Sequence, residues 1–184
     1  MANDKKGYIK VKAEYELIYA DKEPKASILT NTLEAPLQEV RVFNEGNEWE
    51  DGWRNMLIFG DNLLALKSLY EDVKEGGPNK YGLRNKIKLI YIDPPFATKH
   101  DFMKDKEKAY RDKVFGSKFL EFIRKRAVFL REILADDGCF YLHLDWKKGH
   151  YVKAILDEVF GEGNFMNHIS WCYKEREIST RQFN

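Results

Sequence analysis

The chain has 184 residues, of which 43% are hydrophobic and 14% aromatic, and its formal net charge is +1. This length and aromatic content fit one folded domain and argue against a disordered chain. No run approaches the roughly 20 apolar residues of a membrane span, and the charged amino terminus lacks a signal peptide's apolar region, so we expect a cytoplasmic protein without a membrane anchor. Cys139 and Cys172 lack metal-binding spacing, and we expect buried thiols in a reducing compartment.

The first 50 residues show β-like pieces rather than a domain. Residues 8–12 alternate apolar and polar side chains, residues 40–43 form a short apolar run, and Pro24 and Pro36 interrupt the pattern. We therefore expect residues 1–52 to form an arm or accessory segment.

A strand–helix–strand unit is predicted next. Residues 56–59 are apolar and read as a short strand, and apolar side chains at helical spacing follow over residues 63–70. Asp61 or Asn62 is a suitable N-cap for that helix. Residues 87–92 form an apolar run that predicts a buried strand of a parallel sheet. The fold expected from this βαβ pattern is α/β with a mainly parallel sheet.

Four residues follow the second strand at its carboxyl end, where open α/β sheets bind ligands: Asp93, Pro94, Pro95 and Phe96. The exocyclic amine of a nucleobase is a poor nucleophile, because its lone pair is delocalised into the ring. The Asp93 carboxylate and the Pro94 carbonyl can accept its hydrogens, and the two prolines hold that segment stiff. Phe96 can stack on a base that has left the duplex. The pattern thus predicts methylation of an exocyclic amine on a flipped base.

A structural interpretation of the same residues stays open, in which Asp93 caps a turn and Phe96 packs in the core. Residues 97–116 form a long polar stretch that we expect near the target base. From Lys99 to Arg131 there are eleven Lys or Arg and five Asp or Glu, a net of +6. This basic segment either meets a phosphate backbone or forms a solvated loop and an outer helix face, and both alternatives remain open.

The remaining elements are predicted from periodicity. A helix over residues 117–135, capped by Ser117 and ended by residues 136–138, precedes a buried strand over residues 139–144. Asp145 is expected to cap the following helix, which Gly161 ends as its C′ residue. Residues 165–172 are expected to add one more strand. The polar residues His143, Asp145 and His150 do not make a closed metal site, and no metal is expected.

Several of these stretches together resemble the amino-terminal part of adenine-specific DNA methyltransferases of the beta class, above all the modification subunits of type III restriction–modification systems. The similar stretches are residues 53–55, 57–63, 89–96, 140–146, 156–161 and 164–165. The resemblance covers roughly residues 40 to 173, and only the combination is specific.

The resemblance implies a Rossmann-like fold, S-adenosylmethionine as methyl donor and N6 of adenine in double-stranded DNA as acceptor. It implies that Asp93, Pro94, Pro95 and Phe96 hold the target amine. Gly60 and Asp61 are expected near the adenosine of the cofactor, and Asp93 is also expected to border it. The implied protein partners are a second copy of the chain or a restriction subunit, and no membrane is involved.

The resemblance departs from the family pattern in one respect. The glycine-rich methionine-binding motif and the target-recognition region come late in such proteins, and residues 160–163 are a poor match for that motif. We therefore expect a partial methyltransferase domain over residues 53–173 and a tail over residues 174–184 leading toward a recognition region. Two alternatives stay open: a cofactor-deficient subunit that binds DNA or a partner chain without catalysis, and an RNA or protein amino-methyltransferase. The residues alone do not separate adenine N6 from cytosine N4.

Overall fold

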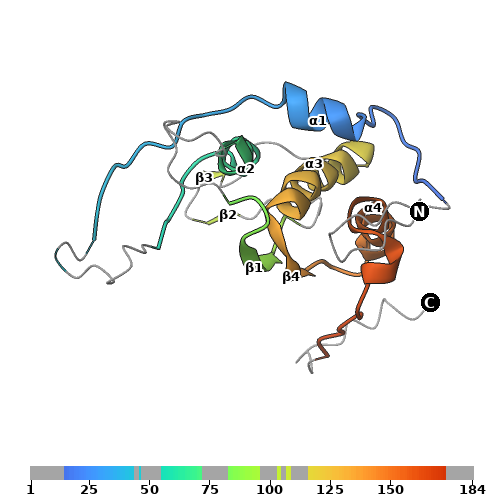
Figure 1. Ribbon diagram of the computed structural model, residues 1–184. Helices are drawn as coiled ribbons and strands as arrows, with labels where there is room; N and C mark the ends of the chain where they lie inside the picture. Colours follow the sequence, from blue (N-terminus) through green and yellow to red (C-terminus); the bar gives the residue numbers. More distant parts are fainter. Residues whose placement is uncertain are drawn as a thin grey trace.

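The computed structural model describes residues 15–43, 46, 55–71, 83–95, 103–104, 107–108 and 116–172. The described part is α/β, and Figure 1 shows its helices gathered around a small sheet. In chain order the elements are α1 (Lys25–Asn31), α2 (Asn62–Glu71), β1 (Ile87–Ile92), β2 (Met103–Lys104), β3 (Glu107–Lys108), α3 (Ser117–Ile133), β4 (Leu134–Leu142), α4 (Gly149–Phe160) and the 3-10 turn η1 (Glu162–Asn164).

Strands β1 and β4 form a two-stranded parallel sheet, and α3 connects them. This confirms the predicted strand over residues 87–92 and its parallel pairing. The βαβ unit of the structure is therefore β1–α3–β4, one unit further along the chain than the sequence predicted. Strands β2 and β3 pair with each other in an antiparallel arrangement.

A bulge divides β4 into two parts. Ile87 pairs with Leu134, but Leu89 pairs with Cys139. Between these two pairs β4 therefore contains more residues than β1, and the extra residues form the bulge. Gly138 lies in this bulge, where an added Cβ would come within 2.7 Å of the Ile87 carbonyl oxygen. The predicted strand start at residue 139 is where regular pairing begins. The predicted helix end was wrong: α3 ends at Ile133, and the chain turns directly into β4.

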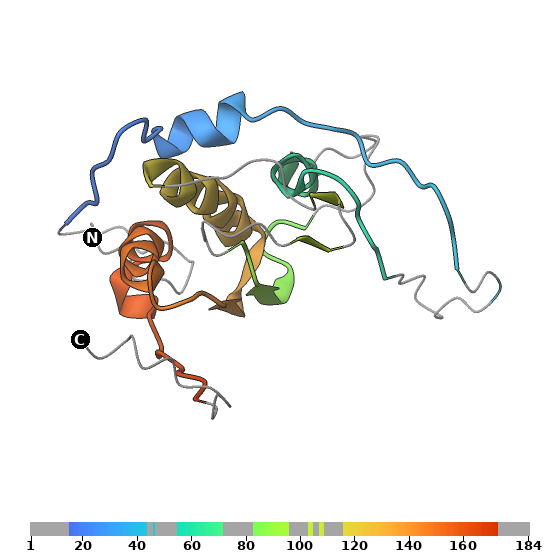
Figure 2. The ribbon, with the colours of Figure 1, turned by 180° about the vertical axis from the view of Figure 1, so that it is seen from behind.

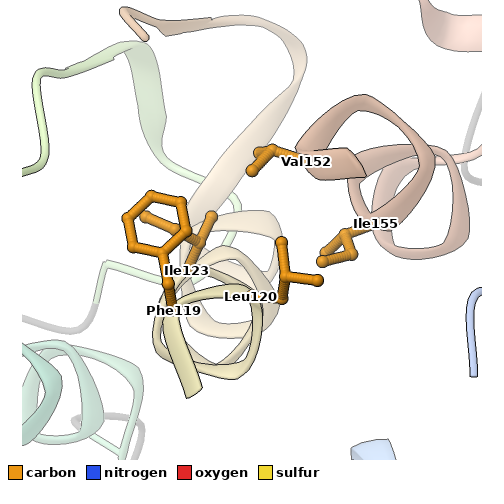
Figure 3. Packing of buried hydrophobic residues seen from close by; sticks show 5 residues of the cluster. All are labelled: Phe119, Leu120, Ile123, Val152 and Ile155. Carbon is orange, nitrogen blue, oxygen red and sulfur yellow. The ribbon is translucent and has the colours of Figure 1, made fainter. Parts of the chain in front are cut away.

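Helix α3 is the centre of the packing. Figures 1 and 2 show it between α1 and the sheet, and its buried face is long because apolar side chains recur at helical spacing along its 17 residues. Figure 3 shows Leu120 of α3 facing Ile155 of α4. Ile90 of β1 belongs to a second cluster with Leu130 and Ile133 of α3.

The described helices cover the β1–β4 sheet on one face only. Ile90 is buried, whereas Leu89 and Tyr91 on the other face of β1 are 62% and 61% exposed. The prediction of a buried strand is thus correct for one face and wrong for the other within the described part of the chain. Cys139 is exposed on β4, and Cys172 is also exposed, so the prediction of buried thiols was wrong.

Residues 15–31 lie against α3 and α4. The short helix α1, which the sequence did not predict, begins after Pro24 and buries Ile28 against Val128 and Phe129 of α3. Polar groups fasten the residues before it. The main contacts are Tyr15 Oη to Asp157 Oδ2 at 2.8 Å, Leu17 N to Glu158 Oε1 at 2.7 Å, Tyr19 Oη to Glu121 Oε2 at 2.5 Å and Lys22 Nζ to Glu158 Oε2 at 2.7 Å.

Three predicted strands are not strands in the structure. Residues 40–43, 56–59 and 165–172 pair with no other strand among the described residues, and most of their large apolar side chains are exposed. An apolar run forms a strand only when a partner supplies its ladder hydrogen bonds, and no described segment does so here. Residues 8–12 lie outside the described residues.

Two predicted caps also differ from the structure. The residue before α3 is Gly116, at φ 60°, and Ser117 is the first helical residue. Asp145 Oδ1 accepts a hydrogen bond from Lys147 N at 3.1 Å in the turn before α4, while Lys148 occupies the N-cap. The prediction for Gly161 is confirmed, because it ends α4 at φ 90°, a conformation that favours glycine. None of the helices in the described ranges has the length and apolar character needed to cross a bilayer.

Candidate functional site

The carboxyl edge of the sheet carries the first group of candidate residues. Ile92 of β1 is in register with Leu142 of β4, so Asp93 and His143 follow the two strands at the same edge. His143 N donates to the Ile92 carbonyl at 2.9 Å, which extends the pairing one residue past the strand ends. Because parallel strands end together here, the Asp93 carboxylate stands where ligands of such sheets bind.

A side-chain hydrogen bond crosses this edge. Tyr91 Oη and His143 Nδ1 lie 3.1 Å apart, on the sheet face that the described helices leave uncovered. Tyr91 precedes Asp93 by two residues and therefore projects to the same side of the strand. The edge thus offers a carboxylate, an imidazole and a phenol within a few residues.

The prolines after Asp93 lie where the sequence predicted them. Asp93 and Pro95 are exposed and Pro94 is half-buried, so the carboxylate is open to an incoming group. Phe96 lies outside the described residues, and its predicted stacking role stays a prediction. Most of the long polar stretch over residues 97–116 also lies outside them.

The turn before α2 carries the second group. Asp61 is the N-cap: its Oδ1 accepts from Leu63 N at 2.8 Å, and its backbone carbonyl accepts from Ala65 N at 3.1 Å. Gly60 is exposed, and its φ of 143° is a backbone conformation that residues other than glycine rarely adopt. This confirms the cap prediction and leaves the Gly60 backbone open to an incoming group.

The described residues do not join the two groups directly. No hydrogen bond or ion pair between described residues connects Gly60 or Asp61 with Asp93. Both groups contact α3 instead. Strand β1 packs against α3 through Ile90, and Asp61 forms an ion pair with Arg126 of α3. Their common support is the helix that follows β1 in the chain.

The basic side chains of α3 are largely engaged within the chain. Arg124 is buried and donates to the Glu23 carbonyl at 2.7 Å, and Lys125 pairs with the Glu23 carboxylate at 2.5 Å. Arg126 pairs with Asp61. Part of the predicted basic segment therefore stabilises the fold, and this part supports the structural interpretation over phosphate binding.

The pKa shifts that the structure produces lie away from both groups. Lys88 at the bulge end of the sheet pairs with Asp137 and holds the pKa of that carboxyl below its usual range, chiefly through their hydrogen bond. Lys22 lowers the pKa of Glu16 in the same way. The hydrogen bond to Asp157 raises the pKa of Tyr15 to about 12. These shifts describe how the arm and the bulge are held, not how the candidate site reacts.

The family is decided by comparison with known proteins. Residues 87–184, more than half of the chain, match the model of the DNA methylase family N6_N4_Mtase. The chain belongs to the DNA methylase family. The matched region begins at β1 and contains Asp93 to Phe96, so the candidate edge lies inside the family's shared region. Membership in this family implies a methyl donor.

Several relatives are modification enzymes. The chain is 40% identical over 117 residues to the type II methyltransferase M.EcaI of Enterobacter cloacae, which covers 63% of the chain and 24% of that protein. It is 34% identical over 132 residues to the probable type III restriction-modification enzyme HindVI Mod subunit of Haemophilus influenzae, covering 72% of the chain and 15% of that protein. It is 28% identical over 160 residues to the EcoP15I Mod subunit of Escherichia coli, covering 73% and 23%. The matched part of the chain thus spans no more than a quarter of the length of these relatives.

Sequence reasoning missed two features of this chain. The Tyr91–His143 hydrogen bond depends on the register of β1 and β4, which a bulge sets. Arg126 meets Asp61 across 65 positions of sequence, and a single sequence contains no signal for that contact. A known register would have revealed the first feature, since Tyr91 and His143 then fall on the same face.

Proposed function

We propose that this methylase takes part in transferring a methyl group from S-adenosylmethionine to N6 of a flipped adenine in double-stranded DNA. The observation that carries the proposal is the exposed Asp93, followed by the half-buried Pro94, at the carboxyl edge of a parallel β1–β4 sheet, inside the region shared with the DNA methylase family. The two-stranded sheet is compatible with a larger Rossmann-like sheet, which is the fold that we propose for the complete catalytic domain.

Each residue of the tetrapeptide has a proposed role. The Asp93 carboxylate accepts a hydrogen bond from one N–H of the amine, and the Pro94 carbonyl accepts a hydrogen bond from the other. These two hydrogen bonds raise the electron density on the nitrogen. Pro94 and Pro95 keep these acceptors in place, because their φ angles are fixed before the base arrives. Phe96 stacks on the flipped base, a contact worth about 1–3 kcal/mol.

The proton balance does not require Asp93 to act as a full general base. When the methyl group passes to the nitrogen, the bond between the methyl group and the donor's sulfonium sulfur would break and leave a neutral thioether. The nitrogen would become cationic and its N–H strongly acidic. The proton is then released through Asp93 or directly to water after transfer. Asp93 is exposed, so water can reach it.

The turn at Gly60 and Asp61 fits the cofactor that we propose. S-adenosylmethionine, when bound, supplies an electrophilic methyl group and carries a ribose with two hydroxyl donors. Asp61 offers a carboxylate whose side chain is 56% exposed, and Gly60 allows close approach of a ligand to the backbone. We propose that these two residues contact the adenosine and that Asp93 borders the reactive end of the cofactor.

The partners follow from the same proposal. Double-stranded DNA is the substrate, and a base must leave the stack to reach the Asp93 edge. Two relatives are named Mod subunits of type III restriction-modification enzymes, and a restriction subunit or a second copy is therefore the protein partner that we propose.

The test is methyl transfer by the purified chain with labelled S-adenosylmethionine, using unmethylated duplex DNA and RNA of the same sequence as acceptors. Digestion to nucleosides then separates N6-methyladenine from N4-methylcytosine. We expect label in N6-methyladenine of DNA, lost at least about a hundredfold in Asp93→Ala, which removes the acceptor that is needed in the transition state. The matched control is Asp137→Ala, an exposed carboxylate at the opposite end of the same sheet.

Each other result contradicts the proposal in a definite way. Undiminished transfer by Asp93→Ala would exclude Asp93 as the amine acceptor. Label in RNA alone would show that the acceptor is RNA and not DNA. Binding of both cofactor and DNA without transfer would indicate a complementing subunit instead of a catalyst.

A further inference from the structure

Arg126 of α3 is the residue that connects the Gly60–Asp61 turn to the rest of the fold. Its Nε donates to Asn62 Oδ1 at 2.6 Å, and its Nη2 lies 3.2 Å from Asp61 Oδ1. Its Nη1 donates to the Phe122 carbonyl at 3.0 Å, and the guanidinium stacks 3.5 Å from the centre of the Phe122 ring. With only 12% of its side chain exposed, Arg126 is held from both sides.

These contacts fix the orientation of the Asp61 carboxylate. Within the described part of the chain, Leu63 N and Arg126 both use Oδ1. We therefore expect the carboxylate to rotate little, and among the described residues no hydrogen bond occupies Oδ2, which is the oxygen available to an incoming donor. A planar guanidinium achieves this because its N–H groups point in fixed directions, which the flexible ammonium of a lysine does not reproduce.

The two helices also pack through contacts that do not involve Arg126. Helix α2 packs on α3 through apolar side chains, among them Leu66 and Tyr70, and the Tyr70 ring meets Phe129 edge to face. Two hydrogen bonds of Arg126 go instead to Asn62, the first residue of α2, and to Asp61, the cap before it. Its place suits the alignment of the turn more than the attachment of the helix.

We propose that Arg126 is a positioning residue for the cofactor: it presents Asp61 Oδ2 to a hydrogen-bond donor on the adenosine of S-adenosylmethionine. The inference rests on the proposed function, in which the Gly60–Asp61 turn contacts the adenosine. It adds a residue of α3, outside the turn itself, that sets the affinity of the turn for the cofactor.

The experiment is calorimetric titration of S-adenosylmethionine into the purified 184-residue chain and its variants. Arg126→Gln should raise Kd roughly tenfold, because the carboxylate loses a charged hydrogen-bond partner that orients it. Arg126→Lys should give an intermediate Kd. The matched control is Lys125→Gln, which removes the neighbouring ion pair to Glu23 on the same helix and should change Kd by less than about twofold.

A double variant separates positioning from a general loss of stability. In Asp61→Asn the carboxylate is absent, so adding Arg126→Gln should cost little further affinity. Unfolding curves of all variants identify the fraction that is folded at the titration temperature, and Kd is compared for the folded fraction. A purely structural role would lower stability in Arg126→Gln and leave the corrected Kd unchanged.

The outcomes separate the inference from the function on which it rests. Absence of binding by the unaltered chain, or binding that Asp61→Asn does not weaken, would overturn the cofactor site and the inference with it. Binding weakened by Asp61→Asn but not by Arg126→Gln would overturn the inference alone. If the losses of affinity in Arg126→Gln and Asp61→Asn simply added in the double variant, the inference would also be overturned. The inference requires that Arg126 acts through Asp61, and additive losses would show that the two residues act independently.

Discussion

Replacing Glu121 with alanine tests how the arm over residues 15–31 is held on α3. Glu121 is buried, with Oε2 accepting from Tyr19 Oη at 2.5 Å and Oε1 accepting from Glu23 N at 3.3 Å. Oε1 also lies 3.3 Å from Nη1 of Arg124, which is buried as well. The change to alanine leaves this guanidinium without its carboxylate partner.

The expected loss follows from the environment of Arg124. Removing one partner of a buried ion pair costs about 3–5 kcal/mol, because the remaining charge stays desolvated. Arg124 Nη1 keeps the Glu23 carbonyl at 2.7 Å, and the buried Nε has no hydrogen-bond partner among the described residues even before the change. We therefore expect the lower end, about 3 kcal/mol. For a chain of this size that lowers Tm by roughly 6–12 °C.

Urea denaturation followed by far-UV circular dichroism measures this free energy. The matched control is Glu132→Ala on the same helix, which removes a more exposed ion pair with Lys25 and should cost less than about 1 kcal/mol. Adding Arg124→Met to Glu121→Ala should recover part of the loss, since the unpaired charge is then gone. A loss in Glu121→Ala no greater than in the control would refute the reasoning.

Two further predictions concern the arm and the bulge. The hydrogen bond of Tyr15 to Asp157 raises the Tyr15 pKa to about 12, so its stabilisation is complete below the unfolded pKa of about 10 and is lost as pH rises toward 12. The difference in unfolding free energy between the chain and Tyr15→Phe should shrink over that interval, and a constant difference would contradict this. Gly138→Ala places a Cβ 2.7 Å from a backbone oxygen of β1 and should destabilise by about 1–3 kcal/mol in urea denaturation. The control Gly149→Ala meets nothing within 4 Å and should be neutral or slightly stabilising, so equal effects would be contrary evidence.

The elements that the sequence predicted well are those with a local cause. Asp61 caps α2 and Gly161 ends α4 at φ 90°, and both follow from the conformational preference of one residue. Strand β1 was predicted because a short apolar run with a turn on each side favours a strand over a helix. The packing of α4 on α3 through Val152 and Ile155 follows from helical periodicity in the same way.

The elements predicted wrongly are those that depend on a partner. Residues 56–59 have the composition of a strand, yet Leu57 and Phe59 are exposed and no described strand pairs with them. Helix α1 is an element that the sequence did not predict but that a partner stabilises. Its seven residues are too few for a stable isolated helix. Ile28 is buried against Val128 and Phe129, and this tertiary contact supplies the stability that no local pattern revealed.

The candidate site combines both kinds of information. A general rule about parallel sheets predicted that Asp93 lies at a ligand-binding edge, and the pairing of β1 with β4 satisfies that rule. Which side chain faces Asp93 depends on a register that a bulge around Gly138 sets, so His143 could be suspected but not assigned from the sequence. The link from Asp61 to Arg126 spans 65 positions and arises only because α2 and α3 pack together. The strand ends therefore mark the edge at which we propose that the reaction occurs, and the packing of helices decides how the proposed cofactor contact is held.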